Sequence, residues 1–280
     1  MTFSIVACDL AARQWGVAVA SKFLAVGAVV PRLEAEVGAI ATQALANTRY
    51  GPDGLAHLRA GLGAQAALDA VVAPDEGRDE RQAGFVDAQG AAATYTGPRC
   101  MAWAGGRTGA GYAVQGNILT GPDVVDAMAA AYEASSGELA ERLLIALAAG
   151  DAAGGDRRGR QSAAIAVVSP GGGYGGNDDQ LVDLRVDDHA DPVPELRRLY
   201  AVHILLTGTT PDEQKLPLEG ALAEEVRALL TRAGYPSEPG AGLDHALRAF
   251  VGTENLETRW WHEDRLDPVV LAHLRAVAAG

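Results

Sequence analysis

The order in which two hydrophobic periodicities follow one another limits the possible folds of this chain more than any other feature. The first 45 residues are short runs rich in Val, Ile and Ala separated by tight breaks, a pattern typical of consecutive antiparallel strands. Helical patterns follow as a group, then further strands and helices. The predicted strands are residues 3–8, 16–20, 25–30, 37–42, 82–87, 91–95, 101–104, 112–115, 162–168 and 181–186. The predicted helices are residues 54–60 and 64–72, one that begins at 121, one from 135 to 150 and one from about 194 to 206.

Grouped strands and grouped helices indicate α+β layering rather than a βαβ alternation. We therefore predict a four-layer αββα sandwich, in which two antiparallel sheets stack face to face and a helix pair covers each sheet on its outer side. This domain would occupy residues 1–208.

A turn-rich stretch at 207–211 separates this domain from a helical tail. Helical patterns lie at 218–230 and 243–251, and a third begins at Asp267-Pro268, an N-cap residue followed by proline at the first helical position. These patterns therefore predict a small all-α domain at residues 209–280.

Composition and charge narrow the possible partners and location. The net charge of −13 argues against nucleic acid and anionic membrane surfaces, which attract concentrated Lys and Arg. No apolar run approaches the roughly 18 residues that span a bilayer, and no secretion signal is visible at the N-terminus. Two cysteines fit a reducing compartment, so we expect a cytoplasmic protein.

The start of the chain carries the strongest chemical signal. Thr2 opens the first predicted strand, and the next strand ends at Ser21-Lys22. If Met1 is removed, the free α-amine and the hydroxyl of Thr2 lie on the same residue, and such an amine can accept the hydroxyl proton during attack. Lys22 is one of only two lysines, and a nearby ammonium would lower the pKa of that amine. The alternative is that Thr2 is simply a small second residue without a catalytic function.

The chain also resembles a known superfamily. The stretches that carry the likeness are Thr-Phe-Ser-Ile-Val-Ala at 2–7, Gly-Val-Ala-Val-Ala-Ser-Lys at 16–22, Val-Gly-Ala-Val-Val-Pro at 26–31, and segments at 41–44, 115–119, 154–164 and 186–189. They resemble N-terminal-nucleophile (Ntn) hydrolases, and more specifically a bacterial family of unassigned function within that superfamily, over residues 2–206. The resemblance implies a proteasome-like αββα sandwich with Thr2 as nucleophile. The tail, with Gly234-Tyr235-Pro236, resembles three-helix peptidoglycan-binding modules.

The supporting residues are predicted partly by analogy with that superfamily. Proteasome-like enzymes have an acidic residue near this position. This chain has Ser21 there, and we name it as a candidate catalytic residue that departs from that pattern. The oxyanion donors would come from backbone near Thr42 and Gln43, or from the side chain of Asn117, although Gly116-Asn117 is also ordinary turn chemistry.

A glycine-rich segment at 154–162 brings three arginines just before a strand. Arginine can hold a substrate carboxylate bidentately, so we name Asp156, Arg157, Arg158 and Gln161 as candidate substrate-binding residues. A solvated loop is the alternative.

These observations favour an amidohydrolase that cleaves a small amide or peptide-like bond, without a cofactor, in a homo-oligomer. Two alternatives stay open. One is a binding or scaffold protein without catalysis. The other is a metal-dependent hydrolase that uses the acidic residues at 178–191, whose oxygen atoms would suit Ca²⁺ or Mg²⁺.

Overall fold

A computed structural model describes residues 2–236, 242–259 and 264–279. Met1, on whose removal the nucleophile prediction depends, lies outside these residues. The chain divides into two compact units, Met1–Arg198 and Leu199–Gly280. The division falls within α5 (Pro192–Thr207), whereas the predicted boundary lies just after that helix. Each unit is described by itself.

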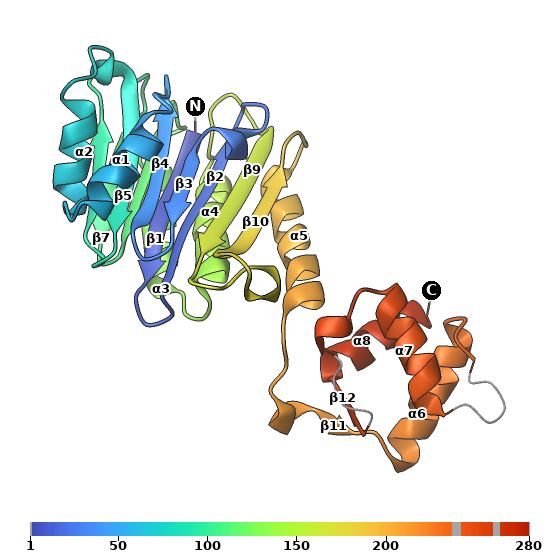
Figure 1. Ribbon diagram of the computed structural model, residues 1–280. Coiled ribbons are helices and arrows are strands. Elements are labelled where there is room, and N and C mark those ends of the chain that lie inside the picture. Colours follow the sequence, from blue (N-terminus) through green and yellow to red (C-terminus); the bar gives the residue numbers. More distant parts are fainter. Residues whose placement is uncertain (1, 237–241, 260–263, 280) are drawn as a thin grey trace. The chain divides into compact units, whose positions relative to one another are not determined.

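The first unit contains a six-stranded antiparallel sheet in the order β10-β9-β2-β1-β8-β7 (Figure 1). Its strands are β1 (Thr2–Asp9), β2 (Gln14–Ser21), β7 (Gly105–Gly109), β8 (Tyr112–Asn117), β9 (Ser162–Val168) and β10 (Gln180–Val186). The register places Thr2 opposite Asn117 and places Ser21 opposite Ser162. The polar residues at one end of this sheet therefore lie side by side.

A four-stranded antiparallel sheet has the order β3-β4-β5-β6. Its strands are β3 (Pro31–Glu34), β4 (Gly38–Ala44), β5 (Arg81–Asp87) and β6 (Ala92–Thr96). Strand β1 contacts β4 and β5, and β8 contacts β5, so the two sheets pack against each other. The predicted α+β class with antiparallel sheets is confirmed.

Two pairs of helices pack on these sheets. Helices α1 (Tyr50–Arg59) and α2 (Ala64–Val72) contact the four-stranded sheet, and α3 (Asp123–Ala134) and α4 (Leu139–Ala152) contact the six-stranded sheet (Figure 1). Apolar residues at helical spacing, such as Leu55, Leu58 and Leu68, face β4 and β5 from the first pair.

The space between the sheets changes character along the strands. Alternate residues of a strand point to the same face, so Thr2, Ser4, Val6 and Cys8 of β1 share one side. Val6 and Cys8 join a buried aliphatic cluster with residues of β4, β5 and β8. Thr2 and Ser4 instead meet buried amide side chains. One end of the interior is therefore apolar and the other is polar.

Two predicted strands are wrong. Residues 26–28 form a 3-10 helix that follows Ala25 at a φ of 52°, and the strand comes later, at Pro31–Glu34. The apolar run is explained by burial of Val26 and Val30 in the core rather than by strand pairing. The strand predicted at 101–104 lies instead at Gly105–Gly109, where a glycine-rich edge strand pairs with β8 despite its low strand propensity.

The second unit is mainly helical, as predicted, but it is not all-α, because two short strands pair within it. It contains α6 (Gly220–Arg232), α7 (Leu243–Thr253), α8 (Pro268–Val277) and a short ribbon of β11 (Leu216–Pro217) and β12 (Arg265–Leu266). Asp267 caps α8, and its Oδ1 accepts a hydrogen bond from the Val269 amide at 2.7 Å. In the described parts of the chain, we find no helix with the length and apolarity that a bilayer crossing requires.

Candidate functional site

A pocket of about 870 Å³ lies where β1 begins and where β2, β4 and β8 end. Thr2 lines it and is 7% exposed, and its hydroxyl Oγ1 lies 3.1 Å from the Oγ of Ser21. Strands β1 and β2 run antiparallel, which brings the first residue of one beside the last residue of the other. Two hydroxyl groups therefore meet at one buried point of the pocket wall.

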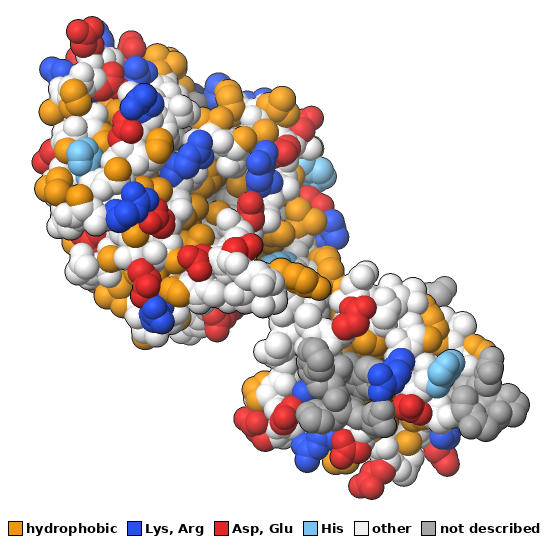
Figure 2. Space-filling view, viewed as in Figure 1, with side chains coloured by type: hydrophobic (Ala, Val, Ile, Leu, Met, Phe, Trp, Pro, Cys, Tyr) orange, Lys and Arg blue, Asp and Glu red, His pale blue; other side chains and the backbone are white. Residues whose placement is uncertain are grey.

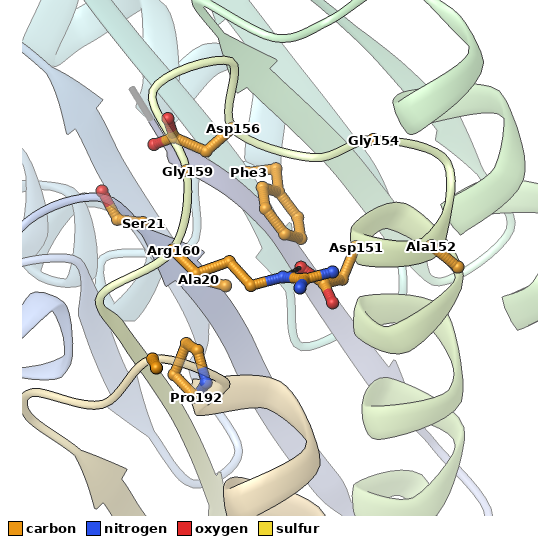
Figure 3. Close-up of a pocket in the computed structure, with 11 residues that line it drawn as sticks. Phe3, Ala20, Ser21, Asp151, Ala152, Gly154, Asp156, Gly159, Arg160 and Pro192 are labelled. Atoms are coloured by element: carbon orange, nitrogen blue, oxygen red, sulfur yellow. Dashed lines mark hydrogen bonds and ion pairs between the residues drawn. The ribbon is translucent and has the colours of Figure 1, made fainter.

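Ser21 also lines a second pocket of about 420 Å³ on the side of Phe3 and Ala20. Figure 3 shows Arg160 reaching across this pocket toward Asp151, with the ring of Phe3 beside them. The Arg160 Nε donates to Asp151 at 2.8 Å. Ser21 therefore belongs to the linings of two pockets.

Buried amide side chains hold the backbone and side chains around Thr2. Gln43 donates from Nε2 to the Thr2 carbonyl at 3.3 Å and to Gln82 Oε1 at 2.8 Å. Asn117 donates from Nδ2 to the same Gln82 oxygen at 3.0 Å. Gln82 in turn donates to the Gly116 carbonyl at 2.7 Å. Gln82 thus joins both amides that flank Thr2, and sequence reasoning missed it.

A second set of hydrogen bonds joins Ser4, Gln43 and Gln115, which are buried between the sheets. Gln115 donates from Nε2 to Ser4 Oγ at 2.6 Å, and Ser4 donates to Gln43 Oε1 at 2.6 Å. The buried Gln115 Oε1 has no hydrogen-bond partner among the described residues. A Cβ at Gly84 would lie 2.0 Å from that oxygen, so only glycine leaves room for it. A glutamine at an inward position of an apolar strand was the available sequence signal for this set.

Arginine side chains also belong to the pocket lining. Arg81, Arg99 and Arg158 line it together with Glu80. Arg81 Nε lies 3.0 Å from Asp75 Oδ2, and Arg99 pairs with Asp79 at 3.7 Å.

Asp75, the carboxylate that pairs with Arg81, is strongly stabilised in its ionised form. Partial burial alone would raise the pKa of Asp75, but it accepts hydrogen bonds from Arg81, Asn47, the Gly77 amide and Tyr50. Together these donors hold the pKa of Asp75 well below its usual range.

Two residues of the lining have an uncommon backbone conformation. Ala44, the last residue of β4, has a φ of 71°, and Ile118, which follows β8, has a φ of 52°. A β-branched residue such as isoleucine rarely adopts positive φ. Backbone strain of this kind concentrates at functional sites, where the surrounding structure enforces it.

The structure brings five of the predicted site residues to the pocket: Thr2, Ser21, Gln43, Asn117 and Arg158. They come from β1, β2, β4, the end of β8 and the loop before β9. Strand alternation explains why Gln43 faces the pocket while its neighbour does not.

That neighbour is Thr42, whose hydroxyl donates to the Asn47 carbonyl at 3.1 Å on the side of α1. Consecutive strand residues point to opposite faces, so only one of the pair can reach Thr2.

Lys22 is not part of the pocket lining, contrary to the expected position beside Thr2. It is exposed, and its Nζ donates to the Arg160 carbonyl at 3.2 Å. Asp156 holds this region together, because its carboxylate accepts from the Lys22 amide at 2.8 Å and from the Arg158 amide at 2.8 Å. Its side chain is 3% exposed and lines the second pocket, and its two hydrogen bonds fix the path of the loop.

The other two residues named from the loop also lie outside the lining. Arg157 is exposed and its backbone amide donates to the Ile118 carbonyl at 3.3 Å. Gln161 donates to Asp188 Oδ1 at 3.1 Å.

The acidic run at 178–191 is described completely. Its side chains bind neighbouring groups: Asp179 accepts from the Gly171 amide, Asp187 pairs with Arg185, and Asp191 pairs with Arg160. Within the described parts of the chain, no group of three or more His, Cys, Asp or Glu is placed to hold a metal ion.

Comparison with known proteins adds three findings. Residues 2–196 match a family of unknown function, DUF1028. Residues 209–274 match a domain whose provisional description is peptidoglycan binding. No curated protein matches the chain significantly.

The chain is also similar to a protein of known structure. That crystal structure is of a protein from Silicibacter pomeroyi, described as a DUF1028 member, which is 33% identical with a TM-score of 0.66. The similarity covers 80% of this chain and 89% of that one. With a family match over most of its length and a relative of this identity, the chain belongs to the DUF1028 family.

Proposed function

We propose that this protein is an amidohydrolase of the Ntn type, with Thr2 as the nucleophile. One observation carries the proposal: the residue directly after Met1 bears a hydroxyl that lines a pocket of ligand size, 3.1 Å from a second hydroxyl. Excision of Met1 would place a free α-amine on that same residue.

The arrangement of layers supports the proposal. Two antiparallel sheets pack face to face, and the helix pairs α1/α2 and α3/α4 lie on different sheets. We interpret this arrangement as the four-layer αββα sandwich that the resemblance to Ntn hydrolases implies. In such a sandwich the nucleophile is at the start of a central strand, which is the place of Thr2 in β1.

The proposed reaction has two steps. Thr2 Oγ1 bonds to the amide carbonyl carbon, and its proton passes to the α-amine, whose ordinary pKa of about 7.7–8.0 suits this role at neutral pH. The carbon–nitrogen bond then breaks, and the proton leaves with the departing amine. Water adds to the resulting ester carbonyl, gives a proton to the same α-amine, and releases the acid as the hydroxyl forms again.

Neighbouring groups receive definite roles. Asn117 is the proposed oxyanion donor, because Gln82 already fixes the orientation of its amide. Ser21 is proposed to hold the Thr2 hydroxyl in position through the 3.1 Å contact. Arg158 is proposed to contact a substrate carboxylate. Lys22, predicted as the cation that lowers the pKa of the α-amine, is left out of the proposed mechanism because it does not line the pocket and its ammonium group donates to the Arg160 carbonyl.

Intact-protein mass spectrometry before and after a β-lactone tests the proposal. We expect loss of one methionine followed by a single adduct at Thr2, absent in Thr2→Ala and retained in Thr120→Ala, which removes an exposed threonine hydroxyl instead. A chain that retains Met1, or that loses it without labelling at Thr2, would exclude this function.

The match of residues 209–274 favours a second candidate function, binding of a peptidoglycan-like polymer by the C-terminal unit. Cosedimentation of the full chain with purified peptidoglycan tests it, and Thr2→Ala would bind as well as the wild type. The homo-oligomer and the cytoplasmic location stay predictions, which light scattering and cell fractionation would examine.

A further inference from the structure

Large exposed hydrophobic side chains gather around the pocket that contains Thr2. Phe23, Leu45 and Met101 are 51%, 58% and 64% exposed, and all three line it. They come from the segment after β2, the end of β4 and the loop before β7, so tertiary structure alone brings them together. Exposed apolar groups that converge on one cavity mark a ligand-binding surface.

The deeper wall of the pocket continues this apolar surface. Val26 and Val30 are buried and belong to the aliphatic cluster between the sheets, and Ile118 lies beside Asn117. The buried hydroxyls and amides occupy the part of the lining around Thr2. A ligand that fits both surfaces has one polar reacting group and one apolar chain.

We propose that the pocket binds N-acyl compounds with an apolar acyl chain, placing the amide carbonyl at Thr2 and the chain against Phe23, Leu45 and Met101. This inference rests on the proposed hydrolase and names its substrate class. A volume of about 870 Å³ lies within the range of pockets that enclose a small organic ligand.

Chain length gives a quantitative expectation. Burial of one CH₂ contributes about 0.8 kcal/mol, which corresponds to about fourfold in affinity. Affinity should therefore rise about 100-fold between acyl groups of two and six carbons, since some methylenes stay partly exposed.

The test uses Thr2→Ala in the full chain, so that binding is measured without turnover. Titration calorimetry with N-acylglycines of two, six and ten acyl carbons keeps the carboxylate constant while the chain grows. We expect the stepwise gain in affinity given above. Affinity that is independent of chain length, or no binding of the ten-carbon compound, would overturn the proposal.

Variants of the apolar rim locate the chain. Phe23→Ser, Leu45→Ser and Met101→Ser in the Thr2→Ala background should each weaken the ten-carbon ligand about tenfold and the two-carbon ligand less than twofold. Leu24→Ser is the matched control, because Leu24 is exposed next to Phe23 but does not line the pocket. Equal effects of Leu24→Ser and Phe23→Ser would contradict the assignment.

Two further outcomes separate the hypotheses. If the rim variants change the oligomeric state in light scattering but not ligand affinity, the rim is an interface with a second copy and the proposal fails. If chain-dependent binding is observed while the wild-type protein neither labels nor hydrolyses these compounds, the hydrolase proposal fails and the acyl-binding pocket remains.

Discussion

The two ends of the space between the sheets differ sharply although the same strands supply both. At one end, Val6, Val17 and Ala113 belong to an aliphatic cluster closed by Trp15. At the other end, the hydrogen bonds from Ser4 to Gln43 and from Asn117 to Gln82 cross from sheet to sheet. Each of β1, β4, β5 and β8 passes from apolar to polar along one face.

This difference indicates that the two ends serve different purposes. Aliphatic side chains stabilise the stack without requiring specific partners, because the hydrophobic effect is not directional. A buried amide is costly unless each polar atom is satisfied, and Gln115 Oε1 has no hydrogen-bond partner among the described residues. An interior selected for stability alone would not concentrate amides beside Thr2, so the polar end is the part that would position Thr2 and Asn117 in the proposed reaction.

On the face of the first unit that Figure 2 shows, surface charge has no comparable separation. Figure 2 shows basic and acidic side chains interspersed over the visible face of the first unit. The contrast between the sheets is therefore not repeated in the charges of that face.

The largest expected effect is at the apolar end. Trp15→Ala should lower the free energy of unfolding by about 3–5 kcal/mol, because a buried indole and its hydrogen bond to the Asp87 carbonyl are lost. Urea denaturation measures this change. In the folded fraction, β-lactone labelling of Thr2 should proceed at the wild-type rate, and a slower rate would show that the two ends are coupled.

Asn117→Ala tests the polar end through chemistry. As the proposed oxyanion donor, its loss should slow acylation of Thr2 about 10²–10³-fold. Time-resolved mass spectrometry of β-lactone labelling gives the rate constant, and thermal unfolding checks that the fold persists. An unchanged rate in a folded variant would remove Asn117 from the mechanism.

Asp75→Asn tests the charged anchor of Arg81 at the pocket. We expect a loss of about 2–3 kcal/mol of stability at pH 7, because four donors lose their carboxylate. The folded pKa of Asp75 lies below its unfolded value, so its contribution is complete above pH of about 4 and is lost as pH falls toward the folded pKa.

Denaturation curves between pH 2 and 7 examine this dependence. The wild-type protein should lose stability on acidification more steeply than Asp75→Asn. Parallel curves for the two proteins would contradict the assigned role of Asp75.

The smallest effect is expected for Gln82→Leu, which keeps a similar volume but removes the bridge between Gln43 and Asn117. Stability should fall by about 1–3 kcal/mol, because buried donors lose their acceptor. Labelling of Thr2 should also slow, since Asn117 is no longer oriented. If stability falls while labelling is unchanged, the network is structural only, and the comparison between the two ends loses its functional meaning.

Local patterns in the sequence predicted much of the fold. Apolar periodicity was sufficient to locate β1, β2, β4, β9 and the four helices packed on the sheets. Burial of one face determines the spacing at which apolar residues recur. The run at 25–30 misled this reasoning, since a buried 3-10 helix and a strand have the same apolar residues. Thr2 and Ser21 could also be named as candidate site residues from the sequence, because they lie at the ends of predicted strands.

Tertiary structure decided the remainder of the site. Arg158 lines the pocket and Lys22 does not, and this outcome depends on the path of a loop more than 130 residues from Lys22 in the sequence. Asp156 fixes that path by accepting a hydrogen bond from the Lys22 amide. The hydrogen bonds of Gln82 to Asn117 and to the Gly116 carbonyl likewise require the stacking of two sheets. The sequence by itself determined which residues alternate and where each strand ends. Only the folded chain decided which polar residues are partners, because a buried amide is stable only where other strands supply its hydrogen bonds.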